Sequence, residues 1–353
     1  MVWTTCWCPT CTALDLASLP RFPWSEVEMA YAEFSNVPNV QTLIDLVVQF
    51  AQANGWTVER NNLAGANRTA TVRIPGVSDY VHLFNTDQLS LQSRLSIGYN
   101  GALDPNSQPL QSPRTVSTRD LVGPFPRVKL FANGTAIHIA IAQATAGEYR
   151  HHAFGVLAKA GAYDGGTYVD GTYWPLNGSS SGVISTSTPT VVLFGYNTNG
   201  LGCGQVRADS VEDGRSNSYH MICNTYGGSF GTEGQAGSGV GPSYQGSSND
   251  VTLDHLWLGR ALGNADENIF SGRSILHPIH LWVRRAGTTP NLSPIGEVVG
   301  LRACYLEKLE PEQEITIGDE TWVVFPWVRK LTMASGSGQP PASNAYGWAI
   351  RKS

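Results

Sequence analysis

The chain has 353 residues, of which 41% are hydrophobic and only 14% are charged, with 38 glycines and a net charge of −5. Soluble domains are typically about 25% charged, and low charge with abundant glycine and aromatic residues favours β-structure with long loops over a helical bundle. No basic run is present, which argues against binding nucleic acid along an extended cationic surface. No apolar run approaches the roughly 20 residues of a membrane-spanning helix, so we expect no membrane-spanning segment.

Residues 1–28 differ from the rest of the chain. They contain Cys6, Cys8 and Cys11 and show neither a helical nor a strand period. Glu26-Val27 can be encoded by a purine-rich run of the ribosome-binding type just before the codon of Met29. We therefore expect translation to begin at Met29, which makes residues 1–28 an upstream reading. The alternatives are an ordered N-terminal extension, or a metal site in which the three thiolates gain a fourth ligand from a distant cysteine or histidine.

The other cysteines, Cys203, Cys223 and Cys304, stand alone in the sequence. We expect them to be small, buried, apolar residues and not metal ligands or half-cystines. The pattern predicts no disulfide framework and fits assembly in a reducing cytoplasm.

The first regular element after Met29 is a helix that follows Asn39. Apolar residues recur at three- and four-residue spacing from Val40 to Ala51, which indicates an apolar stripe packed on a sheet. Asn39 is a favourable N-cap residue, and Asn54-Gly55 is typical of a left-handed helix end. A strand is predicted to begin at Trp56.

Five further elements are predicted in the first half of the chain. Residues 69–74 and 80–84 are strands separated by a Pro-Gly turn. Residues 89–99 alternate apolar and polar side chains, with Leu89, Leu91, Leu95, Ile97 and Tyr99 on one face, which predicts a half-buried strand. Residues 135–145 are apolar or small on both faces and predict a central strand. Residues 149–160 predict a short helix or a strand.

The second half begins with a predicted strand at 189–196. A Gly/Ser-rich segment at 224–249 follows, which cannot fold alone and is either mobile or ordered by a neighbour. Strands are predicted at 277–285 and 297–309, and the alternative for the second is a segment that is in part helical. Residues 314–327 predict a hairpin with Gly318-Asp319 as its two-residue turn, and Tyr346, Trp348 and Ile350 alternate in a final strand.

These elements predict an α+β fold, predominantly antiparallel β, with an N-terminal helix packed on the sheet and long Gly/Ser-rich loops. Residues 29–353 would form one large β-rich domain, or two closely packed subdomains at 29–175 and 185–353.

Two histidine pairs are candidates for metal binding or acid–base chemistry. His151 and His152 are adjacent, and adjacent residues of a strand point to opposite faces, so one cation would rarely bind both. We expect one of them to be packed or hydrogen-bonded and the other to be exposed. His277 and His280 are interpreted in the same way.

Three carboxylates are candidates for glycoside hydrolysis. Glu148, Asp164 and Asp170 lie among the aromatic residues Tyr163, Tyr168, Tyr173 and Trp174. Paired carboxylates beside aromatic rings are what a glycosidase requires. The simpler interpretation is an exposed loop in which the Asp-Gly pairs form turns.

Four aromatic residues near the C-terminus, Trp322, Phe325, Trp327 and Trp348, could form a ligand platform, but we expect them to be sheet core. The sequence contains no phosphate loop, no dinucleotide fingerprint after a strand, no Gly-x-Ser-x-Gly in a plausible strand–turn–helix context and no His-Glu-x-x-His motif. We therefore assign no catalytic, cofactor-binding or metal-binding residue, and we expect neither a cofactor nor enzymatic activity.

Three stretches of the sequence resemble structural proteins of tailed-bacteriophage virions. They are MAYAEF (29–34) with LIDLVVQFAQANGWTVER (43–60), EYRHHAFGVLAKAGAYDGGTYVDGTYW (148–174), and IGDETWVVFPWVRK (317–330) with SNAYGWAIRK (343–352). The resemblance implies a virion component of the tail or baseplate, assembled in the cytoplasm of the bacterial host. Its partners would be other virion proteins and copies of itself.

The leading hypothesis is therefore a structural virion protein that acts by protein–protein assembly. The first alternative is a receptor- or carbohydrate-binding tail module that contacts a host surface glycan through its aromatic residues. The second alternative is a polysaccharide-cleaving enzyme.

Overall fold

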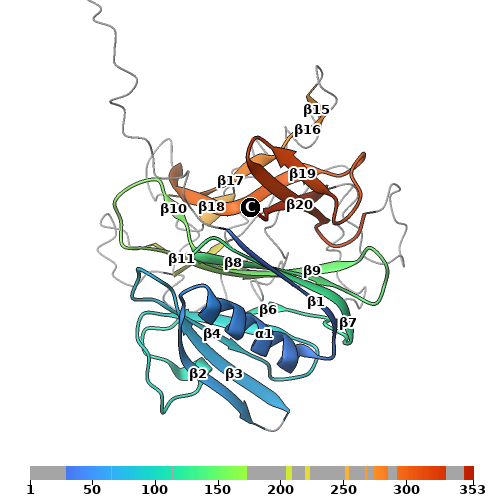
Figure 1. The fold of residues 1–353 in the computed structure, drawn as a ribbon. Helices are drawn as coiled ribbons and strands as arrows, with labels where there is room; N and C mark the ends of the chain where they lie inside the picture. Colours follow the sequence, from blue (N-terminus) through green and yellow to red (C-terminus); the bar gives the residue numbers. More distant parts are fainter. Residues whose placement is uncertain are drawn as a thin grey trace, which may run out of the picture.

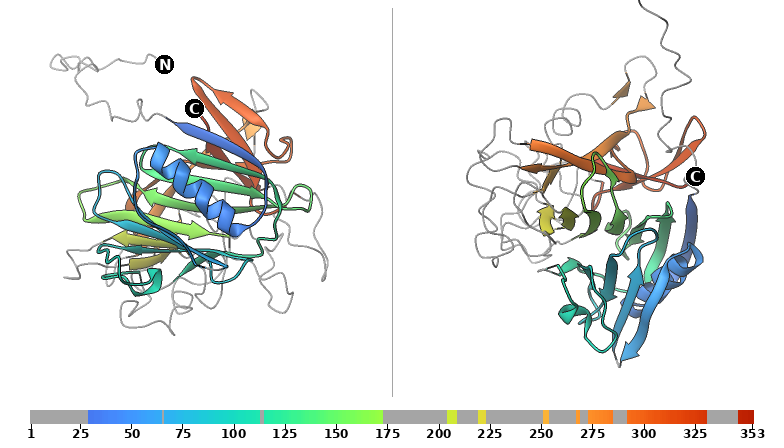
Figure 2. Two further views of the ribbon diagram at one scale, coloured as in Figure 1. Left: turned by 60° about the horizontal axis from the view of Figure 1, so that its bottom comes forward. Right: turned by 90° about the vertical axis from the view of Figure 1, so that its left-hand side faces the viewer.

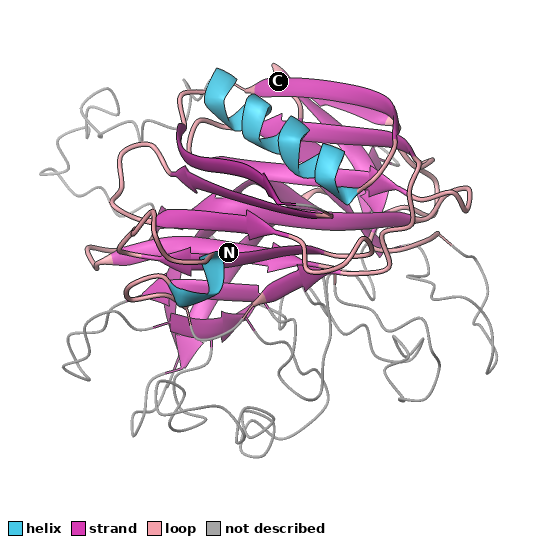
Figure 3. Cartoon of the chain, turned by 90° about the horizontal axis from the view of Figure 1, so that it is seen from below, coloured by secondary structure: helices cyan, strands magenta, loops and turns pink. Residues whose placement is uncertain are grey.

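The computed structural model describes residues 29–64, 66–112, 115–172, 204–208, 219–222, 251–253, 267–268, 273–284, 292–330 and 346–353. These residues are arranged in three layers (Figure 1). A five-stranded sheet with one helix forms the first layer, and a 14-stranded sheet supplies the central and C-terminal layers. The predicted fold class, a β-rich α+β fold, is confirmed, and Figure 3 shows how strongly strands dominate.

The first layer contains α1 (Val40–Ala53) and the strands β2 (Thr57–Ala64), β3 (Asn67–Arg73), β4 (Tyr80–Phe84), β5 (Leu91–Ser96) and β6 (Val116–Thr118), paired in chain order. A short 3-10 helix, η3 (Pro105–Ser107), lies in the loop between β5 and β6. All pairings in this sheet are antiparallel.

The central layer is the first part of the long sheet. It contains, in spatial order, β1 (Ala30–Val37), β7 (Phe125–Ala132), β8 (Ala136–Ala142), β9 (Tyr149–Val156), β11 (Gly165–Gly171) and β12 (Gly204–Ala208). The sheet continues through β13 (Tyr219–Ile222) and β14 (Val251–Leu253), which form its one described parallel pairing.

The C-terminal layer completes the long sheet. Its strands are β17 (His277–Arg284), β18 (Leu292–Tyr305), β21 (Tyr346–Arg351), β20 (Glu320–Pro326) and β19 (Glu314–Ile317), and β10 (Ala158–Lys159) pairs with β18. A separate pair consists of β15 (Glu267–Asn268) and β16 (Arg273–Ser274). Strands from both predicted subdomains thus belong to one sheet.

The helix has the predicted ends. The side chain of Asn39 accepts a hydrogen bond from the backbone N–H of Thr42 at 2.9 Å, and Gly55 has a φ of +83° just beyond the C-cap. α1 lies between the five-stranded sheet and the β1–β7 side of the central layer (Figure 2), and its apolar stripe is buried there. No helix among the described residues is long and apolar enough to cross a membrane.

Two main cores lie on the two faces of the central layer. The first core is shared with α1 and the five-stranded sheet and includes Leu43, Val47, Val72, Leu83, Val128, Ile139 and Phe154. The second core is shared with the C-terminal layer and includes Phe131, Tyr168, Ile279, Leu301, Phe325 and Trp348. Every residue of β8 is buried, which confirms the prediction of a central strand with both faces covered.

The strand predicted over 89–99 is shorter and more buried than expected. It spans Leu91–Ser96, and Leu89 is exposed. Only part of the predicted polar face contacts solvent, because the loop after β5 folds back over it and buries Ser96. Alternation along one strand does not reveal a loop that returns to cover its polar face.

The remaining strand predictions have clear outcomes where residues are described. Within the predicted range 149–160, residues 149–156 form a strand and not a helix. The prediction over 297–309 overlaps a strand that spans 292–305 and is nowhere helical. Ile317 pairs with Glu320 across Gly318-Asp319, as the hairpin prediction required. The predictions for 1–28, 189–196 and 224–249 lie outside the described residues.

Candidate functional site

The three candidate carboxylates are not brought together. Glu148 lies just before β9 and forms an ion pair of 2.7 Å with Arg150. Asp170 is buried on β11 opposite Ala153, five residues further along β9 and therefore about 16 Å away. Asp164 lies in the exposed turn before β11. Glycosidase carboxylates are separated by roughly 5–10 Å, so Glu148 and Asp170 do not have that geometry.

The aromatic residues near these carboxylates face inward where they are described. Tyr168 is fully buried in the second core, and the hydroxyl of Tyr163 donates to the carbonyl of Ile295 at 2.8 Å. Tyr173 and Trp174 lie outside the described residues. The C-terminal residues Trp322, Phe325, Trp327 and Trp348 are all buried, which confirms them as sheet core.

His151 and His152 point to opposite faces of β9, as predicted, but the expectation that one is exposed is wrong. His151 Nε2 donates to the carbonyl of Pro326 in the C-terminal layer at 2.9 Å. His152 lies 3.0 Å from Ser93 Oγ and 2.9 Å from Thr118 Oγ1 in the first layer. Both imidazoles are buried because β9 lies between two other layers, which the local sequence does not show.

A third histidine of the central layer also forms a hydrogen bond to a neighbouring layer. His138 on β8 donates from Nε2 to the carbonyl of Val299 on β18 at 3.0 Å, and Asn133 donates to the same carbonyl at 3.1 Å. Burial lowers the pKa of His138 and of His151 to about 4, and that of His152 to about 3. These imidazoles are therefore neutral at pH 7 and connect the layers by hydrogen bonds. His277 and His280 are both half-buried.

His82 resembles the base of a nucleophile–base pair, and sequence reasoning did not single it out. Its Nε2 lies 2.6 Å from Ser96 Oγ and its Nδ1 lies 3.0 Å from Thr71 Oγ1. The Ser96 hydroxyl donates its one proton to the carbonyl of Gly98 at 2.7 Å. Nε2 must therefore carry a proton and donate to Ser96, which is the reverse of what a general base does.

Burial lowers the pKa of His82 to about 3, with a further contribution from the charges of Arg60 and Arg94. The three-residue arrangement is thus a structural polar network beneath the loop that follows β5. The only sequence signal for it was the polar face of the strand over 91–96.

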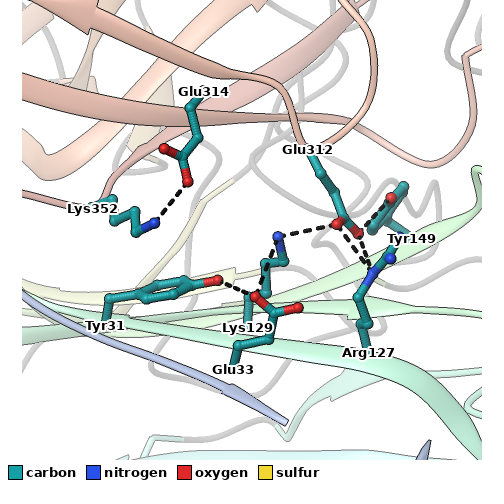
Figure 4. A network of polar contacts seen from close by, with 8 residues as sticks. All are labelled: Tyr31, Glu33, Arg127, Lys129, Tyr149, Glu312, Glu314 and Lys352. Atoms are coloured by element: carbon teal, nitrogen blue, oxygen red, sulfur yellow. Dashed lines mark hydrogen bonds and ion pairs between the residues drawn. The ribbon is translucent and has the colours of Figure 1, made fainter. Parts of the chain in front are cut away.

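A network of charged residues lies at the rim of the second core, between the central and C-terminal layers (Figure 4). We call this network the polar seam; its residues are Tyr31, Glu33, Arg127, Lys129, Tyr149, Glu312, Glu314 and Lys352. Glu312 is the main acceptor. It pairs with Lys129 at 3.0 Å and Arg127 at 3.1 Å, and it accepts a hydrogen bond from the Tyr149 hydroxyl at 2.8 Å.

The rest of the polar seam extends from Lys129 along β1. Lys129 also lies 3.7 Å from Glu33, which accepts a hydrogen bond of 2.6 Å from the Tyr31 hydroxyl. That hydrogen bond lowers the pKa of Glu33, more than its partial burial raises it. Lys352 pairs with Glu314 at 2.7 Å and lies over the Tyr31 ring at 4.6 Å from its centroid.

The polar seam therefore contains three carboxylates and three cations, each within contact of an opposite charge. Burial and the neighbouring Glu312 raise the pKa of Tyr149, which stays protonated as a hydrogen-bond donor. Mutually compensated charges of this kind can hold two layers together. Sequence analysis missed the polar seam because its members come from distant parts of the chain, as Arg127 and Glu312 do at a separation of 185 residues.

A second buried ion pair connects the first layer to the central layer. Asp79, in the turn before β4, contacts Arg207 of β12 at 2.8 and 3.2 Å. Asp79 also accepts a hydrogen bond from the hydroxyl of Thr167 on β11. Two parallel contacts to one carboxylate fix both distance and orientation.

Among the described residues, no group of three or more histidine, cysteine or acidic side chains is placed to hold a metal ion. Cys304 is a free, buried thiol whose pKa is raised by burial, as expected of an apolar cysteine. Cys6, Cys8, Cys11, Cys203 and Cys223 lie outside the described residues.

Comparison with known proteins gives no assignment. No protein-family model matches the chain, and no curated protein is significantly similar to it.

Proposed function

We propose that this protein is a structural component of a bacteriophage virion that acts by protein–protein assembly, in the tail or baseplate. The proposal begins from the resemblance of residues 29–34 with 43–60, 148–174, and 317–330 with 343–352 to virion structural proteins. Its partners would be other virion proteins and copies of itself, and it would reach the virion after assembly in the bacterial cytoplasm.

The observation that carries the proposal is the use of the buried ionisable side chains. His138 and His151 donate to carbonyls of the C-terminal layer, and His152 lies against hydroxyls of the first layer. Glu312 and Asp79 are each held by two or more donors from another layer. Catalysis would require such histidine and carboxylate side chains in an accessible cleft. In this protein they join three layers, as suits a rigid building block.

The proposal is tested by quantitative mass spectrometry of purified virions from the phage that encodes the chain. We expect the protein in mature particles at a fixed, small copy number. Its absence from particles, with the protein present in the infected cell, would rule out the structural role. A reconstruction of the intact virion then tests the tail or baseplate position, which fails separately if the chain is found in the head.

A further inference from the structure

The first strand of the long sheet has an open edge. β1 pairs with β7 on one side, and its other side has no neighbouring strand among the described residues. None of the hydrogen bonds of the described residues joins its outward backbone groups to another segment. Figures 1 and 2 show β1 at the margin of the central layer. An edge of this kind is a template for pairing with another strand.

The β1 edge lacks most of the features that protect edges in monomeric proteins. It contains no proline and no lysine, and its single charged residue, Glu33, is turned into the polar seam towards Tyr31 and Lys129. The one irregularity is Asn36, with a φ of +54°, near the end of the strand. Residues 30–35 keep a regular register with β7.

One edge strand of the first layer, β2, is a useful comparison because it is protected. β2 has an irregular register between Val58 and Arg60, where Glu59 is left out of the pairing. The carbonyl of Glu59 accepts a hydrogen bond from the Tyr99 hydroxyl at 3.2 Å, and Arg60 binds the carbonyl of Gly101. Bulges and charges of this kind discourage pairing, so the β1 and β2 edges differ in how they are protected.

We propose that β1 pairs antiparallel with β1 of a second copy of this chain, so that two long sheets become continuous. This pairing rests on the proposed function, because it names a surface through which copies of the protein would contact one another in the assembly. An antiparallel pair of identical strands has twofold symmetry, and the same residues serve on both sides. No residue of another protein is needed to complete it.

Charge favours a second copy as the occupant. Glu33 is the only ionisable carboxylate or cation on β1, and Lys129 lies beside it, so two such edges meet without net repulsion. Pairing Phe34 with its counterpart places Glu33 opposite Ser35, whereas a shift that pairs Glu33 with itself opposes two like charges.

The faces of β1 also match under this symmetry. Ala30, Ala32 and Phe34 contact the first core, whereas Tyr31 contacts the second. A twofold axis perpendicular to the sheet keeps each face on its own side, so apolar residues continue along one side of the joined sheets and the polar seam along the other.

Amide hydrogen exchange of the full chain over a wide concentration range tests the pairing, with sedimentation velocity on the same samples. We expect protection of residues 30–37 to increase as the dimer forms, while residues 57–64 of β2 stay unchanged. A dimer with unchanged exchange at 30–37, or a monomer at every concentration, would overturn the pairing. Full protection of residues 30–37 in a sample that sediments as a monomer would show that the chain covers its own edge, which also overturns the pairing.

Substitution of Ser35 separates edge pairing from folding. Ser35→Glu places a carboxylate opposite Arg127 within the same chain, which supports the fold of monomer and dimer alike, and opposite Glu33 of the second copy, which disfavours the dimer. We expect it to raise the dimer dissociation constant at least about tenfold. Ser35→Gln and, on the β2 edge, Asn61→Glu are the controls and should leave the constant within about threefold.

An unchanged dimer in Ser35→Glu, or dissociation caused by Asn61→Glu, would contradict the assignment to β1. Detection of the protein in virions is independent of these measurements. A chain that is monomeric in solution but present in particles would therefore refute the pairing and leave the structural role in place.

Discussion

Glu312 shows how one residue can join two layers. Its backbone adopts a φ of +68°, a left-handed conformation that costs a non-glycine residue about 1 kcal/mol or more. The side chain is largely buried and is held by Lys129, Arg127 and Tyr149. These contacts come from two strands of the central layer, so the residue fixes the position of the segment before β19.

We predict that Glu312→Gln destabilises the protein by about 1–3 kcal/mol, because the variant keeps the shape of the side chain but removes the charge that Lys129 and Arg127 require. Denaturant unfolding measures the change. The matched control is Glu310→Gln: Glu310 is 81% exposed and 3.5 Å from Lys330, and should change stability by less than about 0.5 kcal/mol. Equal effects of the two variants would show that the polar seam does not stabilise the fold.

Elements that are specified by neighbouring residues could be predicted from the sequence. The helix after Asn39 and the turn at Gly318-Asp319 depend on contacts within four residues, and both are present. The strand predicted over 89–99 is longer than the strand in the structure, because periodicity does not show where pairing stops. The covering of its polar face depends on the loop between β5 and β6.

That loop is organised by one side chain. Gln108 is buried, and its Nε2 lies within 3.1 Å of the carbonyls of Asn100, Leu103 and Asp104. Its Oε1 accepts from the backbone N–H of Asn100 at 2.8 Å. The loop therefore closes around an amide that satisfies several backbone groups at once.

We predict that Gln108→Ala destabilises the protein by roughly 2–4 kcal/mol, since it leaves buried backbone groups of the loop without a partner. It should also speed amide exchange at Gly98, whose N–H bonds to Pro109. Asn106→Ala, an exposed position in the same loop, is the control and should stay within about 0.5 kcal/mol of the parent chain. Unfolding curves that coincide for the two variants would contradict this role of Gln108.

On the scale of the whole molecule, the sequence predicted the class of fold but not the stacking of the layers. Tyr149 and Glu312 are 163 residues apart and His151 and Pro326 are 175 apart, and no local pattern specifies such partners. The burial of both His151 and His152 follows only from the position of β9 between two layers. The candidate carboxylates do not converge either. Asp170 lies opposite Ala153, which is five residues along the chain from Glu148.

The buried histidines make the stacking of the layers sensitive to acid. Burial lowers the pKa of His82 and His152 to about 3 and that of His138 and His151 to about 4. In the unfolded chain a histidine has a pKa of about 6.5. Between these values the unfolded state binds more protons than the folded state, so stability is highest above pH 6.5 and falls as the pH decreases.

We therefore predict that the free energy of unfolding decreases from pH 7 towards pH 4.5, with a limiting slope of roughly 5 kcal/mol per pH unit if all four histidines contribute. Denaturant midpoints across this range measure the slope. In the folded protein, NMR should show these four imidazoles still neutral at pH 5, while His277, which is half-buried, should titrate at a higher pH than they do. A flat stability profile between pH 7 and 5, or imidazoles that titrate near pH 6.5, would show that the histidines are not sealed between the layers.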